Sequence, residues 1–256
     1  PMIGDRDQRI REALERFRPG SSVDASYDHG LPTQPVGHAV GLEIANHITL
    51  NFRETWRPLS MKITPQQVIE TIVAGGVTNW VLMGLYGYVG YLSQPRATQD
   101  VDVMVAREQR DAAVEAIAKR WPTLEIRDSP IVVRFVDPGE THAGQAPQVV
   151  IDIMLPNDEC QLNILSDCVW IDPATGHRLP TREAALAAKY SAIVSPYREW
   201  VKKTYDAGDL RSIVLAAPDL IDRNEAHRLG ELIFPGGGDE LLEFIQLSID
   251  QKPFRV

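Results

Sequence analysis

Two aspartates separated by one valine, Asp100 and Asp102, have the type and spacing of residues that hold a metal ion. The run 100–105 alternates polar and apolar residues, as a β-strand does when one of its faces is buried. Both carboxylates would then project from the same face of a sheet and repel each other. A divalent cation, or a proton on one carboxylate, would relieve that repulsion, whereas a solvated strand end is the alternative that needs neither.

A third aspartate, Asp152, interrupts the strongly β-forming and otherwise largely apolar run 148–155. Burying an unpaired carboxylate there would be unfavourable, so the charge needs a partner. If this strand lies beside the 100–105 strand, Asp152 joins Asp100 and Asp102 in a set of three carboxylates able to hold two Mg²⁺ ions. An aspartate that caps a neighbouring loop is the alternative interpretation.

The residues before the aspartate pair have the features of a phosphate-binding turn. The apolar run 80–83 ends at Gly84, which opens a glycine-bearing segment of helical character. A glycine at that position lets backbone N–H groups and a helix N-terminus face an anion. Arg96 and Thr98 then lead into the strand, so a phosphate and a metal ion could meet at its start.

This stretch resembles the nucleotidyltransferase-fold superfamily, specifically its minimal and AbiEii-like, toxin-type branch, which shares a glycine turn, a helix and an Arg-x-Thr-x-Asp-x-Asp strand. Five residues carry the resemblance: Gly84, Arg96, Thr98, Asp100 and Asp102. Many members have Gly-Gly or Gly-Ser at the turn, but here methionine and leucine flank the glycine, so the phosphate-holding hydroxyl of the Gly-Ser type is missing. The resemblance implies Mg²⁺, a nucleoside triphosphate donor and a third carboxylate at Asp152.

Lys189 lies on the otherwise apolar side of a helix predicted over residues 181–194. A lysine in that position either extends its ammonium group to the rim of the core or points it into a site. AbiEii-like proteins carry a lysine at the matching place in this helix, so the resemblance implies the second alternative.

A further helix is predicted after Pro196, with charged residues close to one stripe. These residues resemble the family's Arg…Lys…Asp…Asp-Leu pattern: Arg198, Lys202 or Lys203, Asp206, Asp209 and Leu210. Residues 181–211 hold six Lys or Arg and four Asp or Glu, so this hairpin is net positive in an acidic chain. It is the predicted contact for a triphosphate or an RNA end, and a solvated stripe of salt bridges is the alternative.

The remaining elements are predicted from periodicity, helix caps and turn residues. Helices are expected at residues 5–18, 64–73 and 107–120, and two amphipathic helices within 217–256 are separated by the glycine-rich turn 235–238. Strands are expected at residues 123–127, 130–136 and 168–172, and the polar segment 137–145 is expected to form a hairpin or a lid. Residues 42–60 show no clear period and receive no assignment.

Together these patterns predict an α+β (α/β) fold in which helices flank a nucleotidyltransferase-like mixed β-sheet. At 256 residues the chain is long enough to bury a full core. Residues 61–172 would form the sheet-bearing core, residues 173–256 a C-terminal helical region, and residues 1–60 an N-terminal extension of unassigned role.

Composition limits the partners and the location of the protein. The net charge of −9 opposes binding to duplex DNA, so a nucleic-acid partner would need a local basic patch. No apolar run is long enough to cross a bilayer, and the first residues lack the apolar core of a secretory signal. The two cysteines, Cys160 and Cys168, have no histidine partners at zinc-site spacing, which favours reduced thiols and a cytoplasmic protein without a membrane partner.

The histidines show no pattern typical of a site. His29, His38 and His47 are evenly spaced by nine, which matches neither a helix face nor a metal-ligand motif. His177 lies in the turn-forming run 172–180, to which no chemistry is assigned.

Two functional hypotheses follow. The leading one is a metal-dependent nucleotidyltransferase that moves a nucleoside monophosphate from a nucleoside triphosphate to an acceptor. The acceptor would be an RNA end such as that of a tRNA, a protein hydroxyl or a small molecule. The resemblance to toxin-type members implies a toxin with an antitoxin partner. The three aspartates would hold Mg²⁺, and Lys189 and Lys202 would neutralise charge as pyrophosphate leaves. The other predicted contacts of the nucleotide are Gly84, Arg96, Thr98 and Asp209. The alternative is a catalytically inactive protein of this fold that binds a nucleotide or a partner protein.

Overall fold

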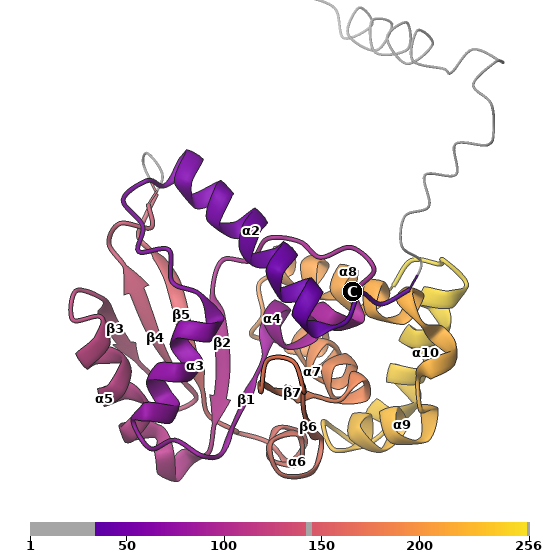
Figure 1. Ribbon diagram of the computed structural model, residues 1–256. Helices are drawn as coiled ribbons and strands as arrows, with labels where there is room; N and C mark the ends of the chain where they lie inside the picture. The colour runs from indigo at the N-terminus through magenta and orange to yellow at the C-terminus, as the bar shows by residue number, and fades with distance from the viewer. Residues whose placement is uncertain (1–33, 142–144, 255–256) are drawn as a thin grey trace, which may run out of the picture. The chain divides into compact units, whose positions relative to one another are not determined.

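A five-stranded mixed β-sheet forms the centre of the computed structural model, which describes residues 34–141 and 145–254 (Figure 1). Its strands lie in the order β1-β2-β5-β4-β3. Their bounds are β1 Trp80–Leu82, β2 Val101–Val105, β3 Glu125–Asp128, β4 Val132–Asp137 and β5 Gln148–Met154. A separate antiparallel pair consists of β6 Val169–Ile171 and β7 Arg178–Pro180. The mixed sheet with flanking helices confirms the predicted α+β class.

Strand β5 lies next to β2 and parallel to it, whereas the other pairs in the sheet are antiparallel. The register of the parallel pair places Asp102 opposite Asp152. Residues opposite each other on neighbouring strands have their side chains on the same face of the sheet. The prediction that the two aspartate-bearing strands are neighbours is therefore confirmed.

Helices flank the sheet and make up most of the chain that follows it. The longer helices are α2 His38–Trp56, α3 Pro65–Ala74, α5 Arg110–Arg120, α7 Arg182–Val194, α8 Trp200–Ala216 and α10 Gly237–Ile249. The shorter ones are α4 Gly84–Tyr88, α6 Glu159–Asp167 and α9 Arg223–Glu231, with 3₁₀ turns η1 Val89–Tyr91, η2 Arg107–Gln109 and η3 Pro218–Leu220. None of the helices in the described part combines the length and the apolar character that a membrane span requires.

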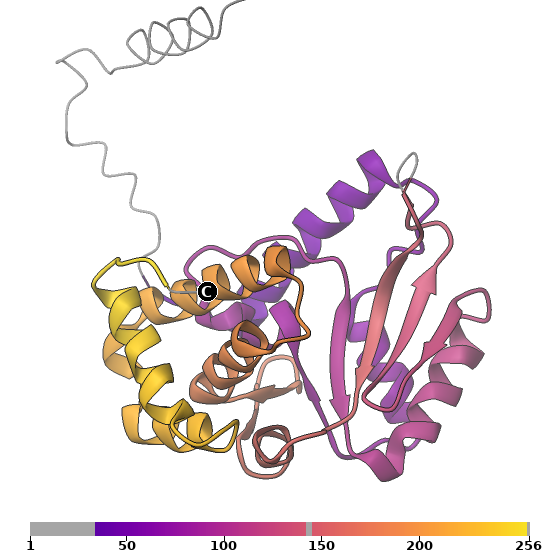
Figure 2. The same cartoon turned by 180° about the vertical axis from the view of Figure 1, so that it is seen from behind.

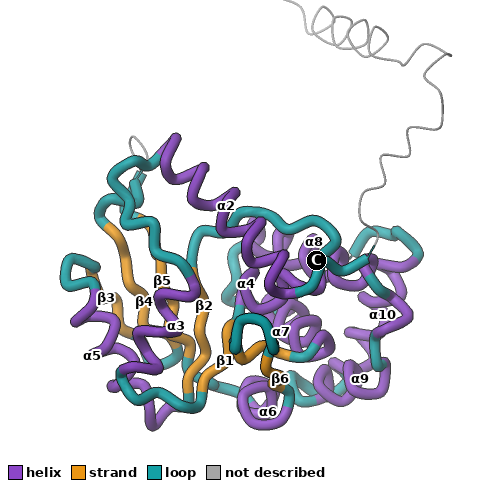
Figure 3. The backbone as a smooth tube through the Cα atoms, viewed as in Figure 1, coloured by secondary structure: helices purple, strands orange, loops and turns teal. Residues whose placement is uncertain are grey.

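The two faces of the sheet have different surroundings. Helices α3 and α5 lie side by side over one face (Figure 1), and the view from behind looks onto the other face of β2, β5 and β4 (Figure 2). Helices α7 to α10 gather beyond the β1 edge (Figure 3). Val103 and Ile153, which alternate with the aspartates, are fully buried together with Ile72 of α3 and Ile117 of α5. The aspartates therefore project from the opposite face, on which α4 contacts β2.

Helix α3 begins where the sequence predicted, and its cap explains why. The Thr64 hydroxyl accepts a hydrogen bond from the Gln67 backbone N–H (3.4 Å), and the Gln67 side chain accepts one from the Thr64 N–H (3.1 Å). Pro65 occupies the first helical position, where its missing N–H is not needed. The helix ends at Ala74, with Gly75 as its C-terminal cap, and a short connection leads to β1.

Helix α2 covers most of the stretch 42–60, to which the sequence assigned no structure. Its buried face includes the polar residues Thr49 and Arg53, while Ile44, Ile48 and Phe52 on its other side are exposed. This inverted distribution hides the helical period, because periodicity predicts a helix only when the apolar face is the buried one.

Several other boundaries differ from the predictions. Arg198 precedes α8, which starts at Trp200, so the charged stripe predicted for this helix does not begin with the arginine; the extended backbone of Glu199 separates them. Helix α6 and the short β7 were not predicted. The segment 137–145 does join β4 and β5 as a hairpin, apart from residues 142–144, which lie outside the described residues together with the helix expected at 5–18.

The described residues, 34–141 and 145–254, fall into one compact unit, so α2 belongs with the sheet. Within that unit, the predicted boundary at residue 172 between a core and a C-terminal helical region stays a prediction. Cys160 and Cys168, predicted to be reduced, are both free and buried.

Candidate metal and phosphate site

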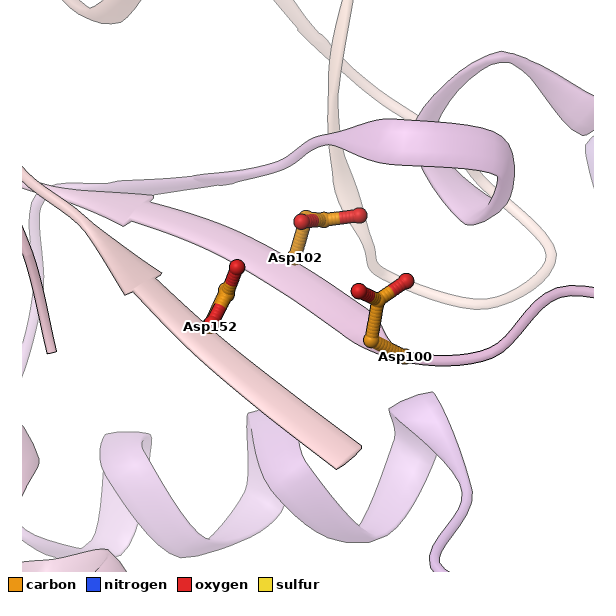
Figure 4. Close-up of side chains that lie close together, drawn as sticks. All are labelled: Asp100, Asp102 and Asp152. Atoms are coloured by element: carbon orange, nitrogen blue, oxygen red, sulfur yellow. The ribbon is translucent and has the colours of Figure 1, made fainter. Parts of the chain in front are cut away.

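Three carboxylates converge on one face of the sheet, and we call them the aspartate triad: Asp100, Asp102 and Asp152. One carboxylate oxygen from each lies within 4.8 Å of one from each of the other two. Figure 4 shows the side chains rising from two neighbouring strands toward a common space. Asp102 and Asp152 face each other across the parallel pair β2–β5, and Asp100 immediately precedes β2. The predicted convergence is confirmed.

The surroundings of the triad disfavour three negative charges. Burial, followed by repulsion from Asp100 and Asp152, raises the pKa of Asp102 well above its usual value. Burial and Asp100 likewise raise the pKa of Asp152 to about 7, and burial raises that of Asp100. The Oδ1 atom of Asp152 is buried without a hydrogen-bond partner. The other oxygen of this carboxylate, Oδ2, makes one loose ion pair among the described residues, with Arg134 (3.7 Å). Nearby cations such as Lys189 and Arg198 offset the effect of burial on the triad only in part.

A divalent cation fits this arrangement. Mg²⁺ prefers hard oxygen ligands and is commonly bound through one or two carboxylates with water and phosphate oxygens in the remaining positions. The triad offers three carboxylates with an unpartnered buried oxygen among them. A bound dication would remove the repulsion that raises these pKa values.

Gly84 is required by its contact with the triad. It has φ of +56°, and a Cβ atom on it would lie 1.9 Å from Oδ2 of Asp102. The preceding residue, Met83, donates its N–H to the backbone carbonyl of Asp102 (2.8 Å). The turn therefore needs glycine both for its left-handed backbone and for the space that the carboxylate fills. Helix α4, which starts here, has five residues.

A second group of charges borders the same cavity, and we call it the paired cluster: Arg96, Lys189, Arg198, Asp206 and Asp209. Lys189 Nζ lies 2.9 Å from a carboxylate oxygen of Asp206 and 2.9 Å from one of Asp209. Arg96 donates two hydrogen bonds to Asp209, from Nε (3.0 Å) and Nη2 (2.8 Å). Arg198 pairs with Asp206 at 2.8 Å. Each of the three cations thus has a carboxylate partner, and the cluster of three cations and two carboxylates keeps one net positive charge.

Tyr88 completes the paired cluster from α4. Its hydroxyl donates a hydrogen bond to Asp209 (2.6 Å), and the Lys189 ammonium lies 4.8 Å from the centre of its ring. Burial would raise the pKa of Asp209, but Lys189 and Arg96 outweigh it and hold that pKa below its usual value. Burial opposes the charge on Lys189, yet Tyr88 and the two aspartates raise its pKa. The ammonium group therefore neither reaches the rim nor stands free in the cavity.

One cavity of about 440 Å³ is bordered by both groups. Its wall also contains predicted site residues outside the two groups: Gly84, Thr98 and Lys202. Of the two lysines that the family pattern allowed, Lys202 reaches this cavity, whereas Lys203 lines a different one. Lys202 is exposed and forms a 3.6 Å ion pair with Glu199. Every predicted site residue thus borders the same space, although Arg96 and Lys189 already have carboxylate partners.

Several residues of the cavity wall escaped the sequence analysis, among them Tyr88, Arg134 and Tyr205. Arg134 lies directly opposite Asp152 in the β4–β5 register, and Tyr205 is an exposed aromatic residue of α8. A signal for Arg134 exists, because it is the one charged residue between the apolar neighbours Val133 and Phe135 of a predicted strand. Nothing in the local pattern distinguishes Tyr205.

Helix α2 holds the entrance to β2 in place. Arg53 donates hydrogen bonds to the backbone carbonyls of Gln99 (2.7 Å) and Ile63 (3.2 Å). It also pairs with Glu140, at 3.2 Å, in the β4–β5 connection, and Arg57 pairs with the same carboxylate. Because Gln99 directly precedes the first aspartate of the triad, these contacts fix the backbone from which that carboxylate projects.

No known family model and no curated protein matches the chain. Among solved structures, the chain is similar to a crystal structure described as an antigenic nucleotidyltransferase-like protein from Paracoccidioides brasiliensis. The two are 13% identical, the match covers 83% of this chain and 94% of the other, and the TM-score is 0.39.

Proposed function

We propose that this protein is a divalent-metal-dependent nucleotidyltransferase, which moves a nucleoside monophosphate from a nucleoside triphosphate to an acceptor hydroxyl. The observation that carries the proposal is the aspartate triad, whose three carboxylates lie within 4.8 Å of one another and have, among the described residues, one loose ion pair, with Arg134. Carboxylates placed in this way on adjacent strands suit Mg²⁺ bound together with phosphate oxygens.

Mg²⁺ held by the aspartate triad would supply charge neutralisation for the phosphates and lower the pKa of a coordinated hydroxyl. The acceptor oxygen would form a bond to the α-phosphorus while the bond to the bridging oxygen of the β-phosphate breaks and pyrophosphate leaves. Asp152, whose Oδ1 has no hydrogen-bond partner in the protein, is suited to accept the proton of the acceptor hydroxyl.

The cations that border the cavity and remain available for phosphate are the exposed Lys202 and the half-exposed Arg134. Their charges would stabilise the leaving pyrophosphate, in line with the role predicted for Lys202. Tyr205 presents an exposed ring at the same wall, on which a nucleobase could stack. The proposed acceptors are an RNA end such as that of a tRNA, a protein hydroxyl or a small molecule, and the proposed setting is a toxin controlled by an antitoxin.

A second candidate function is nucleotide or partner binding without catalysis. It is favoured by the pairing of Arg96 and Lys189 with Asp206 and Asp209, because cations already neutralised by carboxylates contribute little to a triphosphate. The flanking Met83 and Leu85 at the glycine turn, which lack a hydroxyl, agree with this alternative.

Label transfer separates the two candidates. The full chain is incubated with each of the four α-³²P-labelled nucleoside triphosphates, MgCl₂ and a cell extract, and the labelled species is identified as RNA, protein or small molecule. We expect transfer from at least one nucleotide, its loss with EDTA, and a decrease of at least about 10³-fold in Asp102→Asn, because that change removes a charged ligand from the triad while relieving repulsion in the metal-free fold.

The matched control is Asp111→Asn, which makes the same substitution at a carboxylate whose side chain is 91% exposed and outside the triad. It should transfer label at the rate of the unchanged protein. Magnesium-dependent nucleotide binding without transfer would replace the first candidate with the second, and an active Asp102→Asn protein would refute the metal role of the triad.

A further inference from the structure

A second cavity, of about 680 Å³, lies apart from the aspartate triad and shares no lining residue with the cavity there. Its wall is built by the start of α2, the α4–η1 segment, the β6–β7 hairpin, the start of α7 and residues 216–220. Most of these residues are apolar, aromatic or glycine. The size and lining are those of sites that enclose small organic molecules.

An unpaired arginine borders this cavity. Arg182 is the first residue of α7, and its guanidinium group lies 5.0 Å from the centre of the Tyr91 ring. Its Nη1 atom is buried without a hydrogen-bond partner, and within residues 34–141 and 145–254 it forms no ion pair. A partly buried cation without a counterion is unfavourable. An anionic group in the cavity would supply the missing partner, and it would bind well because the planar guanidinium group matches a carboxylate.

An unsatisfied acceptor borders the same cavity. His38, only 4% exposed, contacts His177 through Nε2 (3.0 Å to Nδ1), and His177 Nε2 contacts the side-chain oxygen of Gln66 (2.6 Å). With that oxygen as the acceptor, His177 carries its proton on Nε2 and accepts from the Nε2–H of His38. Nδ1 of His38 is then an unprotonated acceptor, and it is buried without a partner.

The aromatic part of the wall offers ring faces rather than polar groups. Trp170 Nε1 donates to the Tyr91 hydroxyl (2.8 Å), which donates to the carbonyl oxygen of Pro180 (2.7 Å). Both polar groups are therefore satisfied within the protein. Asp219, the one acidic residue of the described wall, is exposed, so an anion beside Arg182 meets no buried carboxylate.

We propose that this cavity binds a small aromatic carboxylic acid that also carries a hydroxyl group. The carboxylate pairs with Arg182, the hydroxyl donates to Nδ1 of His38, and the ring packs against Tyr91 and Trp170. The two residues of this wall with a buried, unpartnered polar atom, Arg182 and His38, thereby each gain the kind of partner that their chemistry requires. The site is separate from the proposed transferase centre and does not depend on it.

Three probes of one shape test the two polar contacts on the unchanged full-length protein: 6-hydroxy-2-naphthoate, 6-hydroxy-2-naphthamide and 2-naphthoate. Isothermal titration calorimetry should show that the amide, which lacks the charge, binds at least about 10-fold more weakly than the hydroxy acid, since a charge-assisted pair is among the stronger contacts. The acid without the hydroxyl should bind about 3- to 10-fold more weakly. Equal affinity for the three probes, or no binding at millimolar concentration, would overturn the proposal.

Substitutions of residues in the cavity wall test whether the probes bind there. Arg182→Gln should remove the difference between the acid and the amide, whereas Arg127→Gln, at an exposed residue of β3, should retain it. Trp170→Phe should diminish the quenching of tryptophan fluorescence by the bound naphthalene. If Arg182→Gln is folded, by circular dichroism, and still prefers the acid, the carboxylate binds elsewhere and the proposal fails. If this variant does not fold, the relative affinities of the three probes for the unchanged protein decide whether the proposal holds.

Discussion

The aspartate triad and the paired cluster border one cavity, yet their carboxylates have opposite properties. In the triad, burial raises the pKa of each carboxyl group, and repulsion within the triad raises the pKa values of Asp102 and Asp152 further, that of Asp152 to about 7. In the paired cluster, Asp209 is also buried, but the pKa of its carboxyl is lowered, because Lys189 and Arg96 outweigh the effect of burial. Burial alone therefore does not decide which carboxylates in a pocket are available to a cation.

The two groups also differ in how much a bound cation could stabilise them. Asp209 accepts hydrogen bonds from Tyr88, Lys189 and Arg96, which leaves little room for another cation. Within the described residues, the triad makes one ion pair, in which Arg134 lies 3.7 Å from a carboxylate oxygen of Asp152. The Arg134 side chain is half exposed. The paired cluster, whose charges already have partners, thus borders the same cavity as a group of carboxylates that a metal ion would stabilise. Four measurements test this contrast.

The largest change in the free energy of unfolding is expected for a substitution in the paired cluster. Asp209→Asn leaves Lys189 and Arg96 with too little negative charge, and removing one partner of a buried ion pair typically costs about 3–5 kcal/mol. We expect the free energy of unfolding, measured by urea denaturation, to fall by about 3 kcal/mol. The control Asp111→Asn, at an exposed residue, should change it by less than about 0.5 kcal/mol. A decrease below about 1 kcal/mol for Asp209→Asn would show that the cluster is not a structural unit.

Magnesium should act on the triad alone. A ligand that binds only the folded state stabilises it by about 2.7 kcal/mol at a concentration 100 times its dissociation constant. Thermal unfolding in MgCl₂ should therefore show a higher Tm than in NaCl of equal ionic strength for the unchanged protein and for Lys202→Gln. The shift should disappear in Asp102→Asn. The same shift in both proteins would place the bound magnesium elsewhere.

Without metal, removing a charge from the triad should stabilise the fold. The pKa of Asp152 is about 7 in the folded protein and 3.8 in the usual reference state, so the folded state binds this proton more tightly. Its contribution to stability is present below pH 4 and is lost as the pH rises through 7. Asp152→Asn should therefore raise the free energy of unfolding by about 2 kcal/mol at pH 8, with no gain at pH 4. Urea denaturation in EDTA at both pH values measures this difference, and a gain that does not change with pH would contradict it.

The smallest effect is expected at the rim of the cavity. Lys202 is exposed and pairs loosely with Glu199, so Lys202→Gln should change the free energy of unfolding by less than about 0.5 kcal/mol. Under the proposed function it should weaken nucleoside triphosphate binding about 3-fold, because one cation near the phosphates is lost. Lys203→Gln is the matched control, since its side chain lines a different cavity. Equal nucleotide affinity of the two variants would remove Lys202 from the site.

The sequence was informative where local rules decide the structure. Alternation along 100–105 predicted two carboxylates on one face, and the single charge in 148–155 predicted that Asp152 would need partners. The capping box at Thr64 predicted the start of α3. Each of these features depends on the spacing of neighbouring residues, which periodicity and cap chemistry describe.

Pairings between distant residues could not be predicted in the same way. The contact of Arg96 with Asp209 spans 113 residues, and the family pattern places both beside a nucleotide rather than with each other. Arg134 reaches the triad through the β4–β5 register, which the sequence does not specify. Helix α2 was missed because its buried face includes Thr49 and Arg53, the reverse of the usual distribution.

The contacts of Arg53 set a limit on how short a working version of this protein can be. A truncated chain that begins at residue 61 would keep every aspartate of the triad but lose both arginines that pair with Glu140, whose side chain is 1% exposed. That carboxylate would stay buried without a counterion, and the backbone before Asp100 would lose the hydrogen bond from Arg53 to Gln99. A minimal fragment made for crystallisation or for transplanting the site into another scaffold therefore has to keep α2 and the arginine that follows it.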